Sequence, residues 1–260
     1  MKWLWSRWPD VEERIRSDEH ILLLLDCDGT LAPIARVPGE ATLPRNTGLL
    51  LRRLSRRRKT TLAIVSGRTV ADLRRLVGLR NITYIGSHGL GVWRNGRHTR
   101  HIMPKSSMDA IARLRPRLAA LVRDFPGAFI EEKWSSLCLH YRLVNADQRA
   151  RLKTAVRLEL TGLEGSAALK VMSGKRVLEI RPNVPWTKGD ACLALMRQMR
   201  RRSLLPIYIG DDRTDEDAFE ALSHGITIRV GDHRRSRARY YVRDTGEVIA
   251  FLEWLTTQAG

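Results

Sequence analysis

Ile21-Leu22-Leu23-Leu24-Leu25, followed by Asp26-Cys27-Asp28-Gly29-Thr30, is the stretch that decides the fold class. Five consecutive apolar residues indicate a β-strand that is buried on both faces, which is typical of a parallel sheet covered by helices. The strand ends abruptly in aspartates and a glycine, and open α/β sheets place their ligands at the carboxyl ends of such strands. The segment therefore predicts a parallel sheet with a polar site at one edge.

The chain on both sides of a central block alternates between helix and strand. Leucines at helical spacing between residues 44 and 59 precede a second apolar strand at 61–65, which ends at Ser66-Gly67-Arg68. The remaining core elements are expected as helices near 70–77, 187–201, 216–223 and 247–257 and as strands near 82–85, 206–209 and 226–230. This alternation predicts a doubly wound α/β core.

The central block reads instead as helix, two strands, helix and two strands. Its elements are expected at residues 106–125, 128–132, 136–144, 146–160, 169–172 and 176–180. Within 136–144, Leu137, Leu139, Tyr141 and Leu143 alternate with Cys138, His140 and Arg142, which predicts one buried and one open sheet face. Pro116 is expected to kink or split the first helix. We therefore expect an inserted α+β domain at 105–182 between core segments 1–104 and 183–260.

Composition excludes several classes of protein. The 260 residues include 43% hydrophobic residues, enough for a folded core, but no run near the roughly 20 apolar residues of a membrane helix. No apolar segment of signal-peptide length opens the chain, so a cytoplasmic location is expected. The three cysteines, Cys27, Cys138 and Cys192, are far apart, which argues against a disulfide framework or a zinc knuckle.

The net charge of +18 requires an explanation. Basic clusters at 56–59, 200–202 and 234–239 can attract phosphates or nucleic acid. No aromatic residues of the kind that stack bases interleave them, which favours solvated faces and no specific nucleic-acid partner. A basic nucleic-acid-binding module stays as an alternative from another class. The sequence does not determine the oligomeric state, for which a monomer is the default expectation.

Polar side chains follow three of the core strands. They are Asp26 and Asp28, then Ser66, then Asp211, Asp212 and Asp215. Carboxylates gathered in one crevice raise each other's pKa unless a cation lies among them, and an all-oxygen donor set suits Mg²⁺ rather than zinc or copper. Such a cation, together with Lys188, suits a phosphate group and hence phosphoryl transfer. A P-loop and an EF-hand are excluded, because other residues stand where each motif requires glycine.

These residues resemble the four motifs of the haloacid-dehalogenase-like (HAD-like) phosphatases. Asp26 to Thr30 resembles the first motif, Ser66 the second, Lys188 the third and the segment from Gly210 to Asp217 the fourth. A narrower resemblance, over about residues 21–255, is to trehalose-6-phosphate phosphatases. It rests on Asp26 to Ile34, Ser66-Gly67-Arg68, Glu131-Glu132-Lys133, His140-Tyr141-Arg142, Gly174-Lys175, Glu179-Ile180-Arg181-Pro182 and Lys188-Gly189. Cys27 departs from that family, which more often has an aromatic residue there.

The resemblance implies a fold and a reaction. It implies a HAD-like core with an α+β cap that closes over the sugar, and Mg²⁺-dependent hydrolysis of trehalose 6-phosphate in trehalose synthesis. Asp26 would be the nucleophile that forms an aspartyl-phosphate, and Asp28, positioned by Thr30, the general acid and base. Ser66 and Lys188 would hold the phosphoryl oxygens.

The resemblance also implies binding residues. Asp26, the Asp28 backbone carbonyl and Asp211 would bind Mg²⁺, with Asp212 and Asp215 behind them. Contacts to the substrate would come from Gly67, Arg68, Glu131, Lys133, Arg142 and Glu179, with His140 and His88 as either ligands or structural residues. Because only the cap distinguishes sugars, a phosphatase for sucrose phosphate or mannosylglycerate phosphate is the nearest alternative. Trp3, Trp5 and Trp8 are expected to anchor the N-terminus on the core.

Overall fold

The computed structural model describes residues 1–17, 20–34, 41–161, 163, 166–174, 176–199, 201, 203–232 and 235–258. It divides into two compact units, Met1–Arg100 with Trp186–Gly260 (unit 1) and His101–Pro185 (unit 2). The domain boundaries expected after residues 104 and 182 lie near these limits and stay a prediction. Lys175, Arg200, Arg202 and Arg234, which belong to sequence motifs named above, lie outside the described residues.

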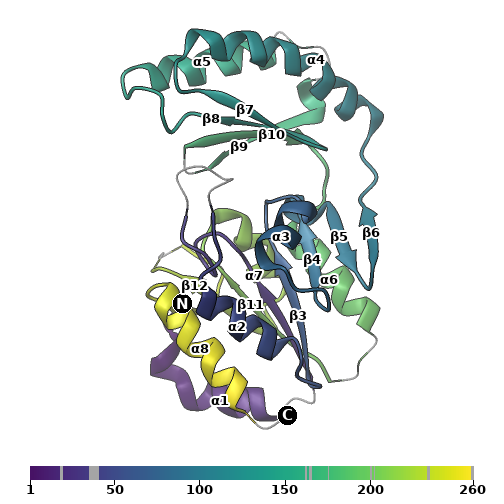
Figure 1. The fold of residues 1–260 in the computed structure, drawn as a ribbon, viewed down its shortest axis with the longest axis vertical. Helices are drawn as coiled ribbons and strands as arrows, with labels where there is room; N and C mark the ends of the chain where they lie inside the picture. Colours follow the sequence, from purple (N-terminus) through teal and green to yellow (C-terminus); the bar gives the residue numbers. More distant parts are fainter. Residues whose placement is uncertain are drawn as a thin grey trace. The chain divides into compact units, whose positions relative to one another are not determined.

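Unit 1 is built on a sheet that has nine strands in the described part of the chain (Figure 1). Its order is β1 (Lys2–Trp3), β13 (Tyr240–Val242), β12 (Ile226–Val230), β11 (Leu205–Gly210), β2 (Ile21–Leu25), β3 (Thr60–Val65), β4 (Thr83–Gly86), β5 (Gly91–Arg94) and β6 (Arg97–Arg100). Neighbouring strands from β1 to β4 are parallel, whereas β5 pairs antiparallel with both β4 and β6. This order confirms the doubly wound parallel core.

The predicted central strand β2 is buried on both faces. Leu23 and Leu25 pack on one side of the sheet with helices α1 (Trp8–Ser17), α2 (Arg45–Leu54), α3 (Val70–Val77) and α8 (Thr245–Thr257). Leu22 and Leu24 pack on the other side with α6 (Lys188–Met199) and α7 (Glu216–Ala221). The uninterrupted leucine run is thus explained by two cores that share one strand.

Besides strand β13, two parts of unit 1 were not anticipated from the sequence. The N-terminal residues form β1, a short 3₁₀ helix and α1, and β1 extends the sheet beside β13. Trp5 and Trp8 pack on the core, as expected of an anchor, and Trp8 contacts Trp254 edge to face. The second part is the β5–β6 hairpin, in which the sequence signal around Asn95-Gly96 indicated only a turn.

Unit 2 contains an antiparallel sheet, α4 (Lys105–Leu121) and α5 (Gln148–Thr161). In the described residues its strand order is β7 (Phe129–Lys133), β8 (Ser136–His140), β10 (Val177–Pro182) and β9 (Leu169–Gly174). Leu139 and Ile180 point to the face that packs against both helices. Cys138 is paired with Glu131 on one side and Glu179 on the other, so these three share the opposite face. The inserted domain therefore has one covered and one polar face, as predicted.

Three local expectations for unit 2 need correction. Strand β8 ends at His140 instead of continuing to residue 144. Leu143 is consequently 64% exposed and not part of a buried row, and Arg142 follows the strand end instead of lying on the open sheet face. Helix α4 is continuous through Pro116, so this residue does not split it, and a kink there stays a prediction.

In the part of the chain that the structure describes, none of the helices has the length and apolar character that crossing a bilayer requires.

Candidate active site

The candidate site lies at the carboxyl ends of β2 and β11, which are neighbours in the sheet of unit 1. Asp26 follows the last residue of β2, and its backbone N–H donates to the carbonyl of Ile209 in β11 (2.9 Å). Asp211 follows the last residue of β11. The chain leaves β2 toward β3 on one side, and β11 lies on the other, so this is the point where the strand order reverses and α/β folds form a crevice.

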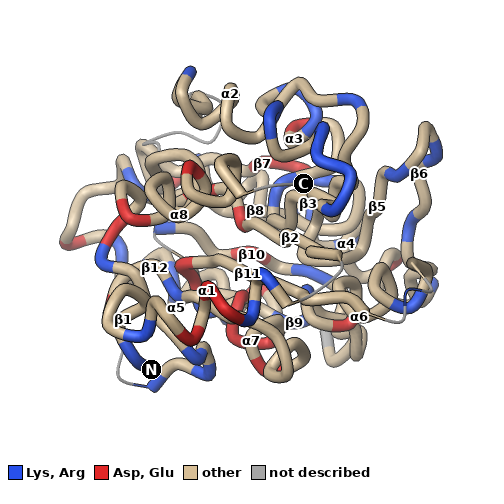
Figure 2. The backbone as a smooth tube through the Cα atoms, turned by 90° about the horizontal axis from the view of Figure 1, so that it is seen from below, with Lys and Arg blue, Asp and Glu red and all other residues tan. Residues whose placement is uncertain are grey.

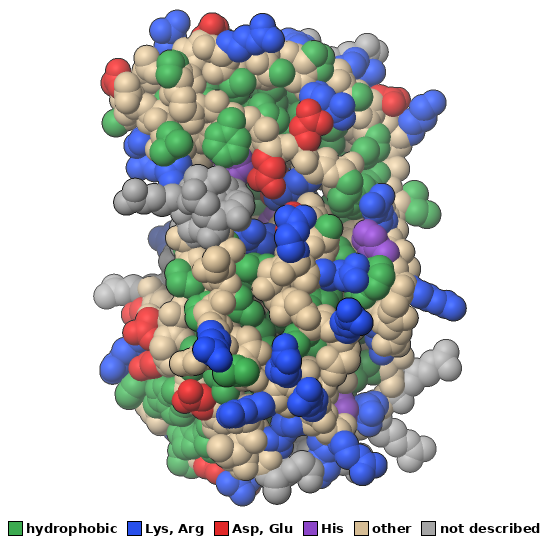
Figure 3. All heavy atoms as spheres, in the orientation of Figure 1, with side chains coloured by type: hydrophobic (Ala, Val, Ile, Leu, Met, Phe, Trp, Pro, Cys, Tyr) green, Lys and Arg blue, Asp and Glu red, His purple; other side chains and the backbone are tan. Residues whose placement is uncertain are grey.

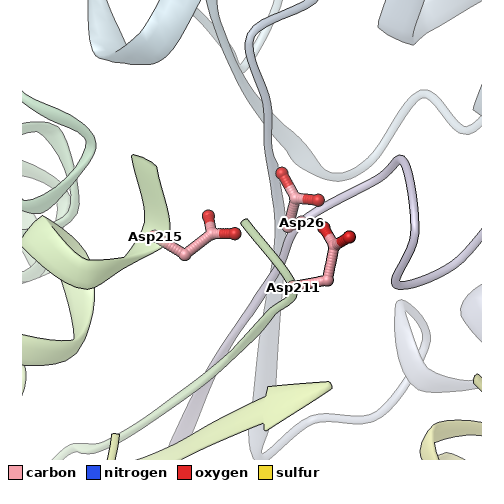
Figure 4. Close-up of side chains that lie close together, drawn as sticks. All are labelled: Asp26, Asp211 and Asp215. Carbon is pink, nitrogen blue, oxygen red and sulfur yellow. The ribbon is translucent and has the colours of Figure 1, made fainter. Parts of the chain in front are cut away.

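Three carboxylates meet there. Asp26, Asp211 and Asp215 each offer one oxygen, and the three oxygens lie within 4.8 Å of one another. Figure 4 shows Asp26 and Asp211 side by side, with Asp215 pointing toward them from the short helical turn after β11. Bringing three acidic groups so close costs electrostatic energy unless positive charge compensates it.

Lys188, the first residue of α6, supplies part of that positive charge. Its Nζ donates to Asp26 Oδ1 at 2.8 Å and to Asp215 Oδ1 at 2.7 Å, and its side chain is only 3% exposed. Burial alone would lower the pKa of Lys188, but Asp215 and Asp26 outweigh it and raise that pKa above the usual value. The ammonium therefore stays charged in the interior.

The single positive charge of Lys188 does not neutralise the three carboxylates of Asp26, Asp211 and Asp215. Burial raises the pKa of Asp26 well above its usual value, Asp215 and Asp211 add to the rise, and Lys188 only opposes it. A further cation beside Asp26 and Asp211 would remove this conflict, and a hard dication such as Mg²⁺ accepts carboxylate oxygens as ligands. The donor set therefore fits the group that the sequence implies.

Gly29 keeps this space accessible. Its φ is +88°, which favours glycine, and a Cβ built there would lie 2.2 Å from Asp211 Oδ2. Any side chain at residue 29 would displace the Asp211 carboxylate.

Neighbouring groups of the protein donate hydrogen bonds to the carboxylates of Asp215 and Asp212. Asp215 Oδ1 accepts from Lys188 and from the Tyr208 hydroxyl (2.7 Å), and its Oδ2 accepts from the Asp212 N–H (2.9 Å). The Asp212 carboxylate accepts from the Arg213 N–H and completes a capping box with Asp215. Both residues thus orient the loop after β11.

Asp28 lies in a bidentate ion pair with Arg68. Arg68 Nε donates to Asp28 Oδ2 at 2.6 Å, and Nη2 donates to Oδ1 at 2.7 Å. Thr30 was expected to help position Asp28, but its buried Oγ1 has no hydrogen-bond partner within the described residues. Arg68 was expected to contact substrate, and in this structure it contacts Asp28.

The loop that carries Arg68 follows β3. Ser66 is 2% exposed, and its Oγ accepts from the Arg68 N–H at 3.2 Å. A Cβ at Gly67 would lie 2.6 Å from the His88 ring, so His88 packs directly on this loop. His88 therefore belongs to the surroundings of the crevice.

Arg229, in β12, is a site residue that the sequence did not reveal. Its guanidinium donates to the backbone carbonyl of Asp211 (2.8 Å), to that of Asp212 (3.3 Å) and to Glu216 Oε1 (2.7 Å). It thereby ties the loop that carries Asp211 to the neighbouring strand. A charged arginine inside a buried strand that is otherwise uncharged is the sequence signal that could have drawn attention to it.

The expected sugar-binding residues of unit 2 lie on its open sheet face, apart from Arg142. His140 Nε2 lies 2.8 Å from Glu131 Oε2, and the Ser136 hydroxyl donates to Glu179 Oε1 at 2.9 Å. Lys133 Nζ lies 3.9 Å from Glu179 Oε1. Burial opposes the charge on Lys133, but Glu179 outweighs it and raises the pKa of Lys133 above its usual value.

Two further basic residues share this face, Lys170 and Arg181, neither of which was assigned a role from the sequence. Arg181 lies two residues beyond Glu179 in β10 and is paired in register with Lys170 of β9. Unit 2 therefore presents a sheet face that carries both acidic and basic side chains.

Comparison with known proteins shows which protein family the chain belongs to. The profile of the trehalose-phosphatase family matches residues 24–245. A protein of Mycobacterium tuberculosis described as an uncharacterized glycosyl hydrolase is 35% identical over 254 residues, which are 94% of this chain and 19% of that protein. The trehalose-phosphate phosphatase of the same species is 33% identical over 245 residues, 91% of this chain and 61% of that enzyme. The chain thus spans only part of the length of both relatives.

The fold of a solved structure supports the same family. The crystal structure of a trehalose-6-phosphate phosphatase related protein superposes with a TM-score of 0.75 at 30% identity, covering 90% of this chain and 96% of that one.

Proposed function

The chain belongs to the trehalose-phosphatase family, and on that premise we propose that it hydrolyses trehalose 6-phosphate to trehalose and phosphate. The observation that carries the proposal is the buried ammonium of Lys188 between Asp26 and Asp215 at the carboxyl ends of two core strands. This arrangement keeps one carboxylate oriented beside positive charge, which a nucleophile that attacks an anionic phosphate requires.

In the first step a carboxylate oxygen of Asp26 attacks the phosphorus atom. A bond forms between that oxygen and phosphorus while the bond from phosphorus to the sugar oxygen breaks, and Asp28 gives its proton to the departing sugar oxygen. Lys188 and Ser66 hold the phosphoryl oxygens and stabilise the negative charge that spreads over them.

In the second step water releases the phosphate. Asp28, now a carboxylate, takes a proton from the water, whose oxygen attacks phosphorus and breaks its bond to Asp26. The products are inorganic phosphate and the original carboxylate of Asp26, and the proton that Asp28 gave away is replaced.

Mg²⁺ is the proposed cofactor. Asp26, Asp211 and the backbone carbonyl of Asp28 would hold it, and it would supply the positive charge that neutralises the phosphate and the acidic cluster. Two observations support this assignment: Asp26 and Asp211 each offer a carboxylate oxygen in the group with Asp215 that lies within 4.8 Å, and the pKa of Asp26 is raised.

Sugar recognition is assigned to unit 2. A disaccharide offers many hydroxyls and no charge besides its phosphate, so its binding site needs side chains that both donate and accept hydrogen bonds. Glu131, Lys133 and Glu179 meet this need. His140 contacts Glu131, the Ser136 hydroxyl donates to Glu179, and Lys133 lies beside Glu179. The proposed binding partner of this sheet face is therefore a small molecule, the sugar phosphate.

The basic clusters are better explained as solvated faces than as a nucleic-acid site. Figure 2 shows Lys and Arg beside α3 and along β5 and β6 as well as near β1, and Figure 3 shows them separated by other side chains on the visible face. The cations are thus dispersed over many elements, whereas nucleic-acid sites gather them on one.

The test is phosphate release from a panel of sugar phosphates with excess Mg²⁺ or with EDTA. We expect kcat/KM for trehalose 6-phosphate to exceed that for sucrose 6-phosphate, glucose 6-phosphate and mannosylglycerate phosphate, and EDTA to abolish the activity. A higher value for another sugar phosphate would move the substrate assignment to that sugar. Release that is unaffected by EDTA would contradict the role of Mg²⁺.

A further inference from the structure

We propose that Arg68 is a positioning residue that aims the carboxyl group of Asp28 at the leaving-group oxygen, and that it does not serve as a phosphate ligand. The observation is the fork of two hydrogen bonds, 2.6 and 2.7 Å long, from the Arg68 guanidinium to the two oxygens of Asp28. The inference deepens the proposed function and rests on it, since it concerns the residue that handles the proton.

The bidentate pair of Arg68 and Asp28 fixes the orientation of the Asp28 carboxyl group as well as its distance from Arg68. The planar guanidinium matches the carboxylate plane, so two parallel bonds determine the rotation of the Asp28 side chain as well as its place. The Asp28 side chain is 31% exposed and that of Arg68 17% exposed. At such a half-buried position an acid without a rigid partner would populate several rotamers, and only some of them would face the substrate.

Hydrogen bonds from the backbone of Ser87 and His88 hold the backbone around Arg68 in place. The Arg68 carbonyl accepts from the Ser87 N–H at 2.7 Å, and the Ser66 carbonyl accepts from the His88 N–H at 3.1 Å. Ser87 and His88 have φ values of +51° and +55°, a region that residues with side chains rarely occupy. Strained residues of this kind persist where the surrounding structure needs their backbone direction, and here both bonds hold the loop from Ser66 to Arg68.

The fork also limits what Asp28 does during the reaction. To give its proton to the leaving group, one oxygen of Asp28 must exchange its contact with Arg68 for a contact with the sugar oxygen. The bond to the second oxygen then preserves the direction of the carboxyl group. A guanidinium bound to the phosphoryl group instead would leave Asp28 without this support.

The two roles have different kinetic consequences. General acid catalysis matters for a poor leaving group and little for a good one, because a stable phenolate departs without a proton. A phosphate ligand matters for every substrate alike, since all carry the same phosphoryl group. The ratio of kcat/KM between aryl phosphates with poor and good leaving groups therefore separates the roles.

The experiment compares wild type, Arg68→Gln, Arg68→Lys and Asp28→Asn on phenyl phosphate and p-nitrophenyl phosphate in excess Mg²⁺. We expect both Arg68→Gln and Asp28→Asn to lower kcat/KM for phenyl phosphate about 100-fold and for p-nitrophenyl phosphate only a few-fold. Arg68→Lys keeps the positive charge but cannot form two parallel hydrogen bonds to Asp28. Its kcat/KM values should therefore resemble those of Arg68→Gln. Arg75→Gln, which removes an exposed arginine of α3 paired with Asp72, is the matched control and should change neither value.

A double variant completes the test. In the Asp28→Asn background, Arg68→Gln should cause little further loss, because the group that it positions is already absent. A parallel loss on both substrates, or a further loss of 10-fold or more in that background, would overturn the inference and make Arg68 a phosphate ligand. Thermal unfolding of each variant checks that it is folded. If wild type hydrolyses no aryl or sugar phosphate, the proposed function fails instead.

Discussion

Replacing Lys188 with methionine should destabilise unit 1 and should make its stability depend strongly on Mg²⁺. The substitution keeps an unbranched side chain of similar length and removes the ammonium that lies 2.8 Å from Asp26 and 2.7 Å from Asp215. Both carboxylates are buried, with side-chain exposures of 6% and 0%. The change therefore leaves acidic groups in the interior without their principal counter-charge.

The expected loss follows from this geometry. Removing one partner of a buried ion pair costs about 3–5 kcal/mol of unfolding free energy. The lower end is expected here, about 3 kcal/mol, for two reasons. Asp215 keeps its bonds from Tyr208 and from the Asp212 N–H, and the raised pKa of Asp26 favours its uncharged form.

Urea unfolding followed by circular dichroism, in EDTA and in excess Mg²⁺, measures both effects. A ligand that binds only the folded state adds stability that grows with its affinity, and the variant has lost a cation that competes with Mg²⁺ for Asp26. Mg²⁺ should therefore stabilise Lys188→Met more than it stabilises wild type. Lys133→Met removes a mostly buried lysine of unit 2 and is the matched control, which should gain no more from Mg²⁺ than wild type does. A loss below about 1 kcal/mol in EDTA, or an equal gain in all three proteins, would refute the reasoning.

Three further predictions concern single residues. Arg229→Gln should weaken Mg²⁺ binding about 10-fold or more in calorimetry, because it frees the Asp211 carbonyl, and unchanged affinity would contradict that role. Glu179→Ala should lower kcat/KM for trehalose 6-phosphate roughly 10-fold to a few hundred-fold while p-nitrophenyl phosphate changes much less; a parallel fall would mean that Glu179 acts through folding. Burial and the nearby Arg201 lower the pKa of His20, so the unfolded chain takes up the proton more readily. The free energy of unfolding should thus fall as the pH drops below about 6.5, and His20→Gln should flatten that dependence; identical pH profiles would contradict it.

The sequence was enough to predict those parts of the fold that depend on the local pattern of apolar and polar residues. The run Ile21–Leu25 indicated a strand between two helical layers because its alternate side chains enter two separate cores. The polar residues at the ends of β2, β3 and β11 could be expected to share one edge because parallel strands place their carboxyl ends together.

The contacts that could not be predicted join residues far apart in the chain. Arg68 and Asp28 are both present in sequence motifs, but nothing local says that they bond to each other across 40 positions. The tie from Arg229 to the Asp211 carbonyl depends on the pairing of β12 with β11, which no periodicity shows. The end of β8 at His140 was also missed, because the apolar alternation continues in sequence after the hydrogen-bonded ladder has stopped.

The central claim is that Asp26 accepts the phosphoryl group, and the mass of one trapped protein tests it most directly. Asp28→Asn lacks the base that activates water, whereas p-nitrophenyl phosphate needs no acid to leave, so the phosphorylated protein should accumulate. With Mg²⁺ we expect the intact mass to rise by one phosphoryl group, borohydride reduction to locate it on Asp26, and the Asp26→Asn/Asp28→Asn double variant to show no rise. Continued turnover by Asp28→Asn with no phosphorylated protein, or a phosphoryl group on a residue other than Asp26, would contradict the account.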